Sequence, residues 1–171
     1  MKRISLIILL ALFTATAAWS QRIAYIDSDY ILENIPEYKA AEAEIEQLSV
    51  EWQKELEDKF ARIEQLFRSY QAEAPLLPEE VRRQREENIM NLEKEAKELQ
   101  MKRFGRDGEL FRRREEMIQP IQDRIYEAVK EIAGRSNYAI IFDKAAGTTM
   151  MFTDMRYDLS DEVLQRLGYR R

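Results

Sequence analysis

The 171-residue chain contains neither cysteine nor histidine, and only five glycines and four prolines. Without cysteine there is no disulfide scaffold and no thiol nucleophile, and without histidine there is no Ser-His-Asp triad. The two absences together remove the imidazole and thiolate ligands of zinc sites. Few glycines and prolines beside 35% charged residues favour long helices. The composition therefore predicts a scaffold without a cofactor, not an enzyme.

The chain also lacks an excess of positive charge, since its 27 lysines and arginines are outnumbered by 32 aspartates and glutamates. Nucleic-acid-binding domains normally present a basic field to the phosphate groups. A net charge of −5 argues against such a field, so nucleic acid is not an expected partner.

Residues 1–20 have the pattern of a secretory signal peptide. Lys2 and Arg3 form a positive start, an apolar run covers residues 4–13, and small residues precede Gln21. This order is typical of a cleaved leader. The run is shorter than the about 20 residues of a membrane-spanning helix, which disfavours a membrane anchor. We therefore expect cleavage near Gln21 and a periplasmic mature protein.

Residues 36–120 are predicted to form a helical arm. Apolar side chains recur every three or four positions over residues 36–74 and again over 79–118, the pattern of long amphipathic helices. A proline-containing loop, 75–78, separates the two stretches. Each helix would be about 60 Å long at 1.5 Å per residue, so we expect an antiparallel hairpin. Pro120 is expected to kink or reset the second helix.

Gly105 and Gly108 lie inside the second predicted helix. Each costs about 1 kcal/mol relative to alanine in a helix interior. Two interpretations stay open: a flexible joint that lets the arm splay, or a local irregularity or close helix packing.

The segments on either side of the arm, 21–35 and 121–171, are predicted to form one small β body. Residues 23–26 form a short strand, and a brief helix capped by Asp27 or Ser28 follows. Pro36 ends that helix and starts the arm.

The second body segment begins with a helix that is expected to end near Gly134. Residues 137–143 give the strongest strand signal and, being apolar, are expected to be buried on both faces. Residues 150–153 are predicted to form a return strand. A last helix is expected to be capped by Ser160 and stopped by Gly168.

These elements predict an α+β fold that is mostly α, with a long antiparallel helical hairpin inserted between the strands of a small body. One copy supplies only two or three short strands, too few for an independent core. Apolar strand residues are therefore expected to pack against neighbouring chains: Ile23, Tyr25, Ile140, Ile141 and Phe142.

Over nearly its whole mature length the sequence resembles the Skp/OmpH family of periplasmic chaperones. The segments that carry the resemblance are, in order, RIAYIDSDYIL (22–32), PEYKAA (36–41), IQPIQDRIYEAVKEIA (118–133), YAIIFDK (138–144) and DLSDEVL (158–164). The resemblance implies a homotrimer in which three helical tentacles on a β body surround a cavity. It also implies ATP-independent holding of unfolded outer-membrane proteins.

The charge of this chain departs from the family, whose best-known members are strongly basic. Without residues 1–20 the chain has 25 basic residues against 32 acidic ones. Local arginine clusters remain at 82–85 and 112–114. They offer a transient contact with a membrane surface or are simply solvated helix faces.

Client contacts are expected from apolar residues at the tip and off the main apolar stripe of the arm: Leu66, Leu76, Leu77, Met101 and Phe104. Many weak contacts suit a client without a fixed shape. The alternative for each is a place in the hairpin core. The alternative function is a periplasmic coiled-coil tether or adaptor that binds a folded envelope partner at the Leu76-Leu77 tip.

Catalysis by clustered carboxylates is a weaker alternative. Asp27, Asp143 and Asp154 could meet at strand ends, but no phosphate loop, nucleophile elbow or cofactor motif accompanies them in the sequence. We expect these carboxylates to cap helices or bind turns.

Overall fold

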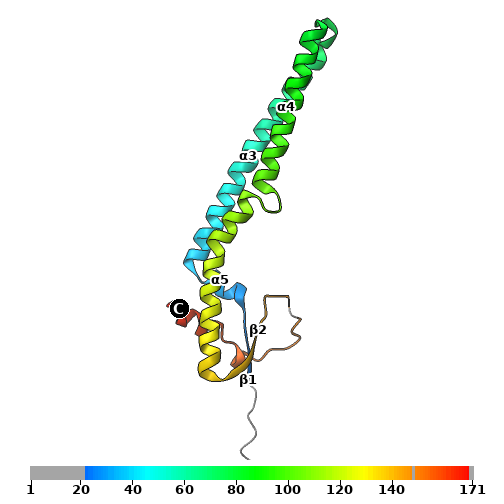
Figure 1. Cartoon of the computed structure of the whole chain (residues 1–171). Coiled ribbons are helices and arrows are strands. Elements are labelled where there is room, and N and C mark those ends of the chain that lie inside the picture. Colours follow the sequence, from blue (N-terminus) through cyan, green and yellow to red (C-terminus); the bar gives the residue numbers. More distant parts are fainter. Residues whose placement is uncertain (1–21, 148, 170–171) are drawn as a thin grey trace, which may run out of the picture. The chain divides into compact units, whose positions relative to one another are not determined.

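The computed structural model describes residues 22–147 and 149–169, so the predicted signal peptide lies outside the described residues. The chain divides into two compact units (Figure 1). We call residues 35–123 the arm, and residues 22–34 together with 124–169 the body. The described residues are mostly helical and contain one pair of strands, which confirms the predicted α-rich α+β class.

The arm begins with α3 (Pro36–Glu73), which carries proline at its first position as predicted. Its buried residues are Ala41, Ile45, Leu56 and Ile63. These positions fall on one face because their spacings of 4, 11 and 7 residues are close to whole turns. The face forms the seam against the returning helix.

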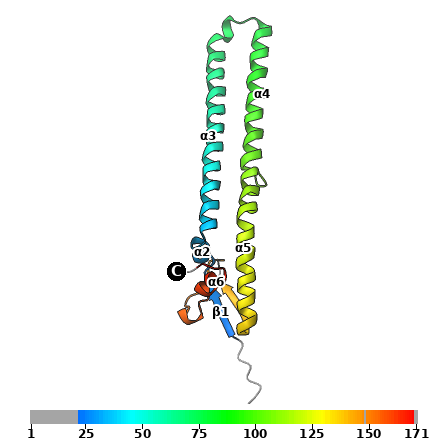
Figure 2. The ribbon, with the colours of Figure 1, turned by 90° about the vertical axis from the view of Figure 1, so that its left-hand side faces the viewer.

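Helix α4 (Glu79–Phe104) runs antiparallel to α3, and the 3₁₀ turn η2 (Ala74–Leu76) lies between them (Figure 2). The seam centres on buried Ile63, Ile89 and Ala96, with Leu66, Tyr70 and Leu92 packed against them. Glu79 and Glu80 occupy the first turn of α4, where carboxylates favour the positive end of the helix dipole.

The second arm helix is not continuous, so the prediction of one helix over 79–118 was wrong. Helix α4 ends at Phe104 and α5 (Glu109–Ser136) begins five residues later. The intervening residues 105–108 form a short loop held by two hydrogen bonds, from the Gly105 N–H to the Met101 carbonyl and from the Gly108 N–H to the Gly105 carbonyl, both 2.9 Å. Two glycines within four residues lower the helix propensity enough for a turn to replace the helix.

Pro120 does not reset the helix, which was one of the two predicted effects of this residue. Helix α5 passes through Pro120 and ends at Ser136, two residues beyond the expected stop at Gly134. A proline inside a helix costs about 3 kcal/mol. Burial of Ile118 and Ile121 on either side of Pro120 opposes this cost.

The body is built on two parallel strands, β1 (Arg22–Ile26) and β2 (Tyr138–Asp143). Ile23 pairs with Ile140, and Tyr25 with Phe142. Helix α2 (Ser28–Glu33) is capped by Asp27, whose side chain accepts a hydrogen bond from the Tyr30 N–H, as predicted.

The last part of the body contains the 3₁₀ turn η3 (Met155–Tyr157) and helix α6 (Ser160–Arg166). The predicted return strand over 150–153 is absent there. Instead, Tyr25 forms an isolated parallel bridge with Asp158, so the edge of β1 is occupied by a later segment. Gly168 ends α6 with φ 91° as expected, and the Tyr169 N–H donates to the Leu164 carbonyl in a Schellman arrangement.

Two further expectations for the body need correction. Strand β2 is not buried on both faces of the single chain, because Ile140 and Phe142, which point to the same face, stay 46% and 41% exposed. Ser160 is the first residue of α6 and makes no cap bond to it. Its hydroxyl oxygen accepts a hydrogen bond from the Asp27 N–H at 2.9 Å.

Candidate functional site

The arm leaves large apolar side chains exposed beside its seam. Phe60 and Phe67 each follow a buried seam residue of α3 by four positions, which places them about 40° off the seam. Phe67 is 44% exposed. Met90 and Met101 on α4 are 68% exposed and lie eleven residues apart, three turns along one face.

Helix geometry places these four side chains on one side of the hairpin, with the phenylalanines about 40° and the methionines about 100° to 140° from the seam. We call this side the Phe/Met flank (Phe60, Phe67, Met90 and Met101). Two antiparallel helices turn in opposite senses when viewed from one end. Residues displaced forward from the seam on each helix therefore lie on the same side of the pair. The four residues follow buried Leu56, Ile63, Ile89 and Ala96 by four, four, one and five positions. The hydrogen bond between Tyr70 and Glu86 and the 2.8 Å ion pair between Glu73 and Arg85 fix the axial register.

The predicted client residues differ in availability. Leu76 at the tip is 86% exposed, and Met101 lies on the Phe/Met flank. Leu77 is half-buried. Leu66 packs against the seam cluster, and Phe104 makes an edge-on contact with Trp52 at 6.4 Å between ring centroids. The structure thus offers Leu76 and Met101 to a partner most openly.

The arginines near the tip are all engaged in ion pairs. Arg82 and Arg83 both contact Glu79, and Arg85 contacts Glu73. Arg113, in the second cluster, lies 2.7 Å from Glu44. These ion pairs favour the interpretation of Arg82, Arg83, Arg85 and Arg113 as parts of solvated, internally neutralised helix faces.

The body carries a second exposed apolar surface, on the open face of the two-stranded sheet. A groove of about 740 Å³ runs along this face, and its floor includes Ile23, Tyr25 and Phe142. Phe152 and Tyr157 from the following segment line its side. Met151 in the same segment is 99% exposed. Neighbouring exposed apolar side chains of this kind make the face a candidate binding interface.

The residues predicted to join neighbouring chains lie on both sides of this sheet. Paired Ile23 and Ile140 and the adjacent Phe142 are exposed on the open face. Tyr25 is buried within the chain, and Ile141, half-buried, points to the opposite side.

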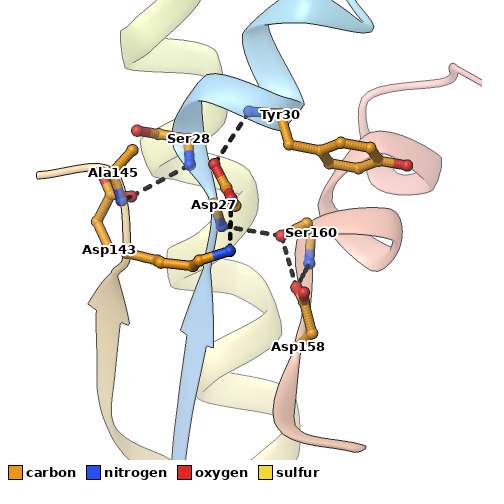
Figure 3. Close-up of polar contacts among 8 residues, drawn as sticks. Asp27, Ser28, Tyr30, Asp143, Ala145, Asp158 and Ser160 are labelled. Atoms are coloured by element: carbon orange, nitrogen blue, oxygen red, sulfur yellow. Dashed lines mark hydrogen bonds and ion pairs between the residues drawn. The ribbon is translucent and has the colours of Figure 1, made fainter. Parts of the chain in front are cut away.

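Polar side chains at the ends of the strands hold the body together (Figure 3). The Ser28 N–H donates to Asp143 at 3.1 Å, Lys144 lies 3.2 Å from Asp27, and the Ser160 hydroxyl donates to Asp158 at 2.6 Å. The Tyr30 N–H bond first, and then Lys144, lower the pKa of Asp27 despite its partial burial.

The three carboxylates considered for catalysis all bind local backbone or charge. Asp27 caps α2, Asp143 accepts from the Ser28 and Ala145 N–H groups, and Asp154 caps η3 while pairing with Arg156. Their oxygens are therefore occupied in structural contacts.

Sequence reasoning missed the exposed apolar run that follows β2, because it assigned residues 150–153 to a strand. Met151, Phe152 and Met155 are among the most exposed apolar residues of the described chain. The signal was the lack of a polar alternate position in MMF, which a half-buried strand would need. Of the Phe/Met flank, Met101 was among the predicted client contacts. The seven-residue spacing of Phe60 and Phe67, which is offset from the Leu56–Ile63 repeat, is the signal that places the two phenylalanines beside the seam.

Across residues 22–147 and 149–169, no helix combines the length and the apolar character needed to span a bilayer. Within the same ranges, no group of three acidic side chains is arranged to hold a metal ion.

A long helical hairpin attached to a small parallel-stranded body defines a distinct class of scaffold, and comparison with known proteins identifies it. The sequence profile of the outer membrane protein (OmpH-like) family matches residues 22–167. The chain therefore belongs to the OmpH-like family, which confirms the resemblance found in its sequence.

A solved structure shares the fold. It is that of a candidate outer membrane chaperone (OmpH-like) from Caulobacter crescentus CB15, with a TM-score of 0.68 over 87% of this chain and 85% of that one. The two sequences are 12% identical. A search of curated proteins returns no significant match.

Proposed function

We propose that the protein is an ATP-independent holding chaperone of the periplasm that binds unfolded outer-membrane proteins and prevents their aggregation. Membership of the OmpH-like family and the chaperone description of the structurally similar protein support this role. The observation that carries it is the Phe/Met flank, where four large apolar side chains stay exposed beside a seam that is already filled.

The chemistry of the Phe/Met flank suits an unfolded client. Methionine is flexible and polarizable and adapts to irregular partners, while phenylalanine supplies a large apolar area. Each side chain buries little alone, at roughly 25 cal/mol per Å² of apolar area. Several copies of the flank would together hold a client reversibly, since linked weak contacts add through their effective concentration.

The body supports the proposal of a homotrimer. Its sheet has two strands and an open apolar face, and a two-stranded sheet is not stable alone. Joining three bodies through Ile23, Ile140 and Phe142 would cover that face and bring three arms together around a client. The signal peptide would deliver the chain to the periplasm.

An aggregation assay without nucleotide tests the proposal. The protein should suppress light scattering by several unrelated, urea-unfolded outer-membrane proteins on dilution. Replacing Phe60, Phe67, Met90 and Met101 by serine should raise the concentration needed for half suppression by about tenfold, a loss of 1.4 kcal/mol. Lack of suppression by the unchanged protein would refute the chaperone role.

One observation favours the adaptor alternative, namely the 86% exposure of Leu76 at the arm tip. An adaptor would bind one folded envelope protein and ignore unfolded chains. Leu76→Ser with Leu77→Ser would then abolish that binding. For a chaperone, the same double change should alter aggregation suppression less than loss of the Phe/Met flank.

A further inference from the structure

The break between α4 and α5 is built into the backbone by its glycines. A Cβ at Gly105 would lie 2.3 Å from the Met101 carbonyl oxygen, and a Cβ at Gly108 would lie 2.8 Å from the Arg103 carbonyl oxygen. Both distances are too short for any side chain. The loop 105–108 can close in this compact form only because both positions lack a side chain.

Side chains from three helices close over the break. The Arg103 guanidinium stacks on the Trp52 ring of α3, 4.3 Å from its centroid, and pairs with Glu109 at the start of α5. It also lies 3.8 Å from Glu55. Phe104 packs edge-on against Trp52. We call this set the Arg103 clamp (Trp52, Glu55, Arg103, Phe104 and Glu109).

The clamp encloses most of the Arg103 side chain but does not provide a hydrogen-bond acceptor for every one of its donors. Its side chain is 24% exposed, and its buried Nε donates no hydrogen bond to any residue that the structure describes. A buried donor without a partner carries a desolvation cost. This cost favours a second, open conformation in which water accepts a hydrogen bond from the Arg103 Nε.

The break lies opposite an unbroken helix, and this asymmetry has a mechanical consequence. Helix α3 runs without interruption from Pro36 to Glu73. With helix axes about 9 Å apart, a bend of about 10° in the plane of the hairpin changes the path of one helix by roughly 1.6 Å relative to the other. That is about the rise of one residue. Two intact helices could not absorb this difference, whereas a four-residue loop in one of them can.

We propose that loop 105–108 is a length-compensating joint that lets the arm bend, and that the Arg103 clamp holds the joint in its closed form. Release of Arg103 from Trp52 and Glu109 frees the loop to lengthen or shorten while α3 only curves. This inference concerns the arm itself and does not depend on what the arm binds.

Hydrogen exchange of the full chain tests whether Arg103 closes the joint. Arg103→Gln should speed exchange of the amides in residues 101–112 about tenfold and leave residues 45–63 of α3 unchanged. Arg103→Lys retains the charge but loses the flat guanidinium, and should give a smaller increase. Arg106→Gln removes the same charge from an exposed position in the same loop and should change exchange less than twofold.

Bending is measured separately with spin labels, which is straightforward because the chain has no cysteine of its own. Asn91→Cys and Gln119→Cys place labels on α4 and α5 on either side of the joint. Labelled chains are diluted into unlabelled protein so that distances within one chain dominate. Arg103→Gln should broaden the distance distribution, and Arg106→Gln should leave it as narrow as in the parent.

Two results would overturn the proposal. Unchanged exchange over 101–112 in Arg103→Gln would show that the clamp does not close the joint. Faster exchange with an unchanged distance distribution would show that the loop opens without bending the arm. The chaperone role is tested separately by the aggregation assay. If the protein failed to suppress aggregation, the exchange and distance measurements would still decide whether loop 105–108 is a joint.

Discussion

The arm and the body solve the burial of apolar side chains in different ways. The arm fills its seam within one chain, with Ile63, Ile89 and Ala96 all buried, and exposes apolar side chains beside the seam and at the tip. The body leaves the central face of its sheet open, including Ile140 and Phe142. The arm therefore buries its seam within a single hairpin, whereas the body leaves an apolar face that the proposed trimer would cover.

Charge separates the two regions as well. The arm carries 22 acidic against 16 basic residues, while residues 22–34 and 124–171 together are close to neutral, with 10 against 9. A near-neutral apolar surface favours permanent association, and a charged surface stays solvated. Association is thus expected at the body, and solvated separation of the arms.

The largest effect is expected from a charge on the open face of the body. Phe142→Asp would bury a carboxylate among apolar groups in the assembled state and should weaken association at least thirtyfold, about 2 kcal/mol or more. Analytical ultracentrifugation would detect the monomer. Val50→Asp puts the same charge on an exposed apolar position of the arm and should leave assembly intact. If a trimer still forms in Phe142→Asp, the open face of the body is not the surface through which the chains associate.

A substitution in the seam of the arm should lower the free energy of unfolding and leave the assembly of the chains unchanged. Ile63→Ala deletes a buried side chain and should lower the free energy of unfolding by about 3 kcal/mol, measured by urea unfolding followed by circular dichroism. Phe60→Ala, one turn away on the exposed flank, should cost less than about 1 kcal/mol. Equal losses would show that the seam and the Phe/Met flank are not distinct.

The polar contacts of the body predict a sensitivity to acid. Because the pKa of Asp27 is lowered in the fold by the Tyr30 N–H and Lys144, its carboxylate stabilises the protein above its unfolded-state pKa. That contribution is lost as the pH falls through the folded-state value. Asp27→Asn keeps a helix cap but removes the charge. The fall in the free energy of unfolding between pH 5 and 2 should therefore be about 1 kcal/mol smaller in this variant than in the parent. Parallel pH profiles for the two proteins would contradict this role.

The smallest effect is expected at the charged surface near the arm tip. Arg85→Gln breaks an exposed ion pair with Glu73 and should change stability by about 0.5 kcal/mol or less. In 1 M NaCl, where the Debye length is about 3 Å, the difference should disappear. A loss that persists in high salt would mean that Arg85 contributes by packing.

The elements that sequence reasoning placed well are those with a strong local signal. Pro36 marks the start of α3, Asp27 the cap of α2, and Gly168 the end of α6, because each residue type has a conformational preference that tertiary packing does not oppose. The seam was equally readable, since Leu56 and Ile63 follow the helical period.

The errors came from positions where two local preferences compete. Pro120 disfavours a helix that continues through it, but the buried isoleucines on either side favour one, and α5 is continuous there. Gly105 and Gly108 were treated as features of a continuous helix, whereas their joint effect is to end it. The exposure of Phe142 and Met151 depends on which distant parts of the chain pack against them. A short window of sequence does not contain that information.

The parallel pairing of β1 with β2 bears on the order in which the chain acquires its structure. Ser28 and Asp143, which are hydrogen-bonded at the ends of these strands, lie 115 residues apart in sequence. A contact of such separation is slow to form in a flexible chain, because the entropy of closing the intervening loop must be overcome first. The hairpin folds from local contacts and returns its two ends to one place, so it shortens the effective loop. Strand β1 therefore has no pairing partner until the segment that holds β2, residues 138–143, is available to the folding chain.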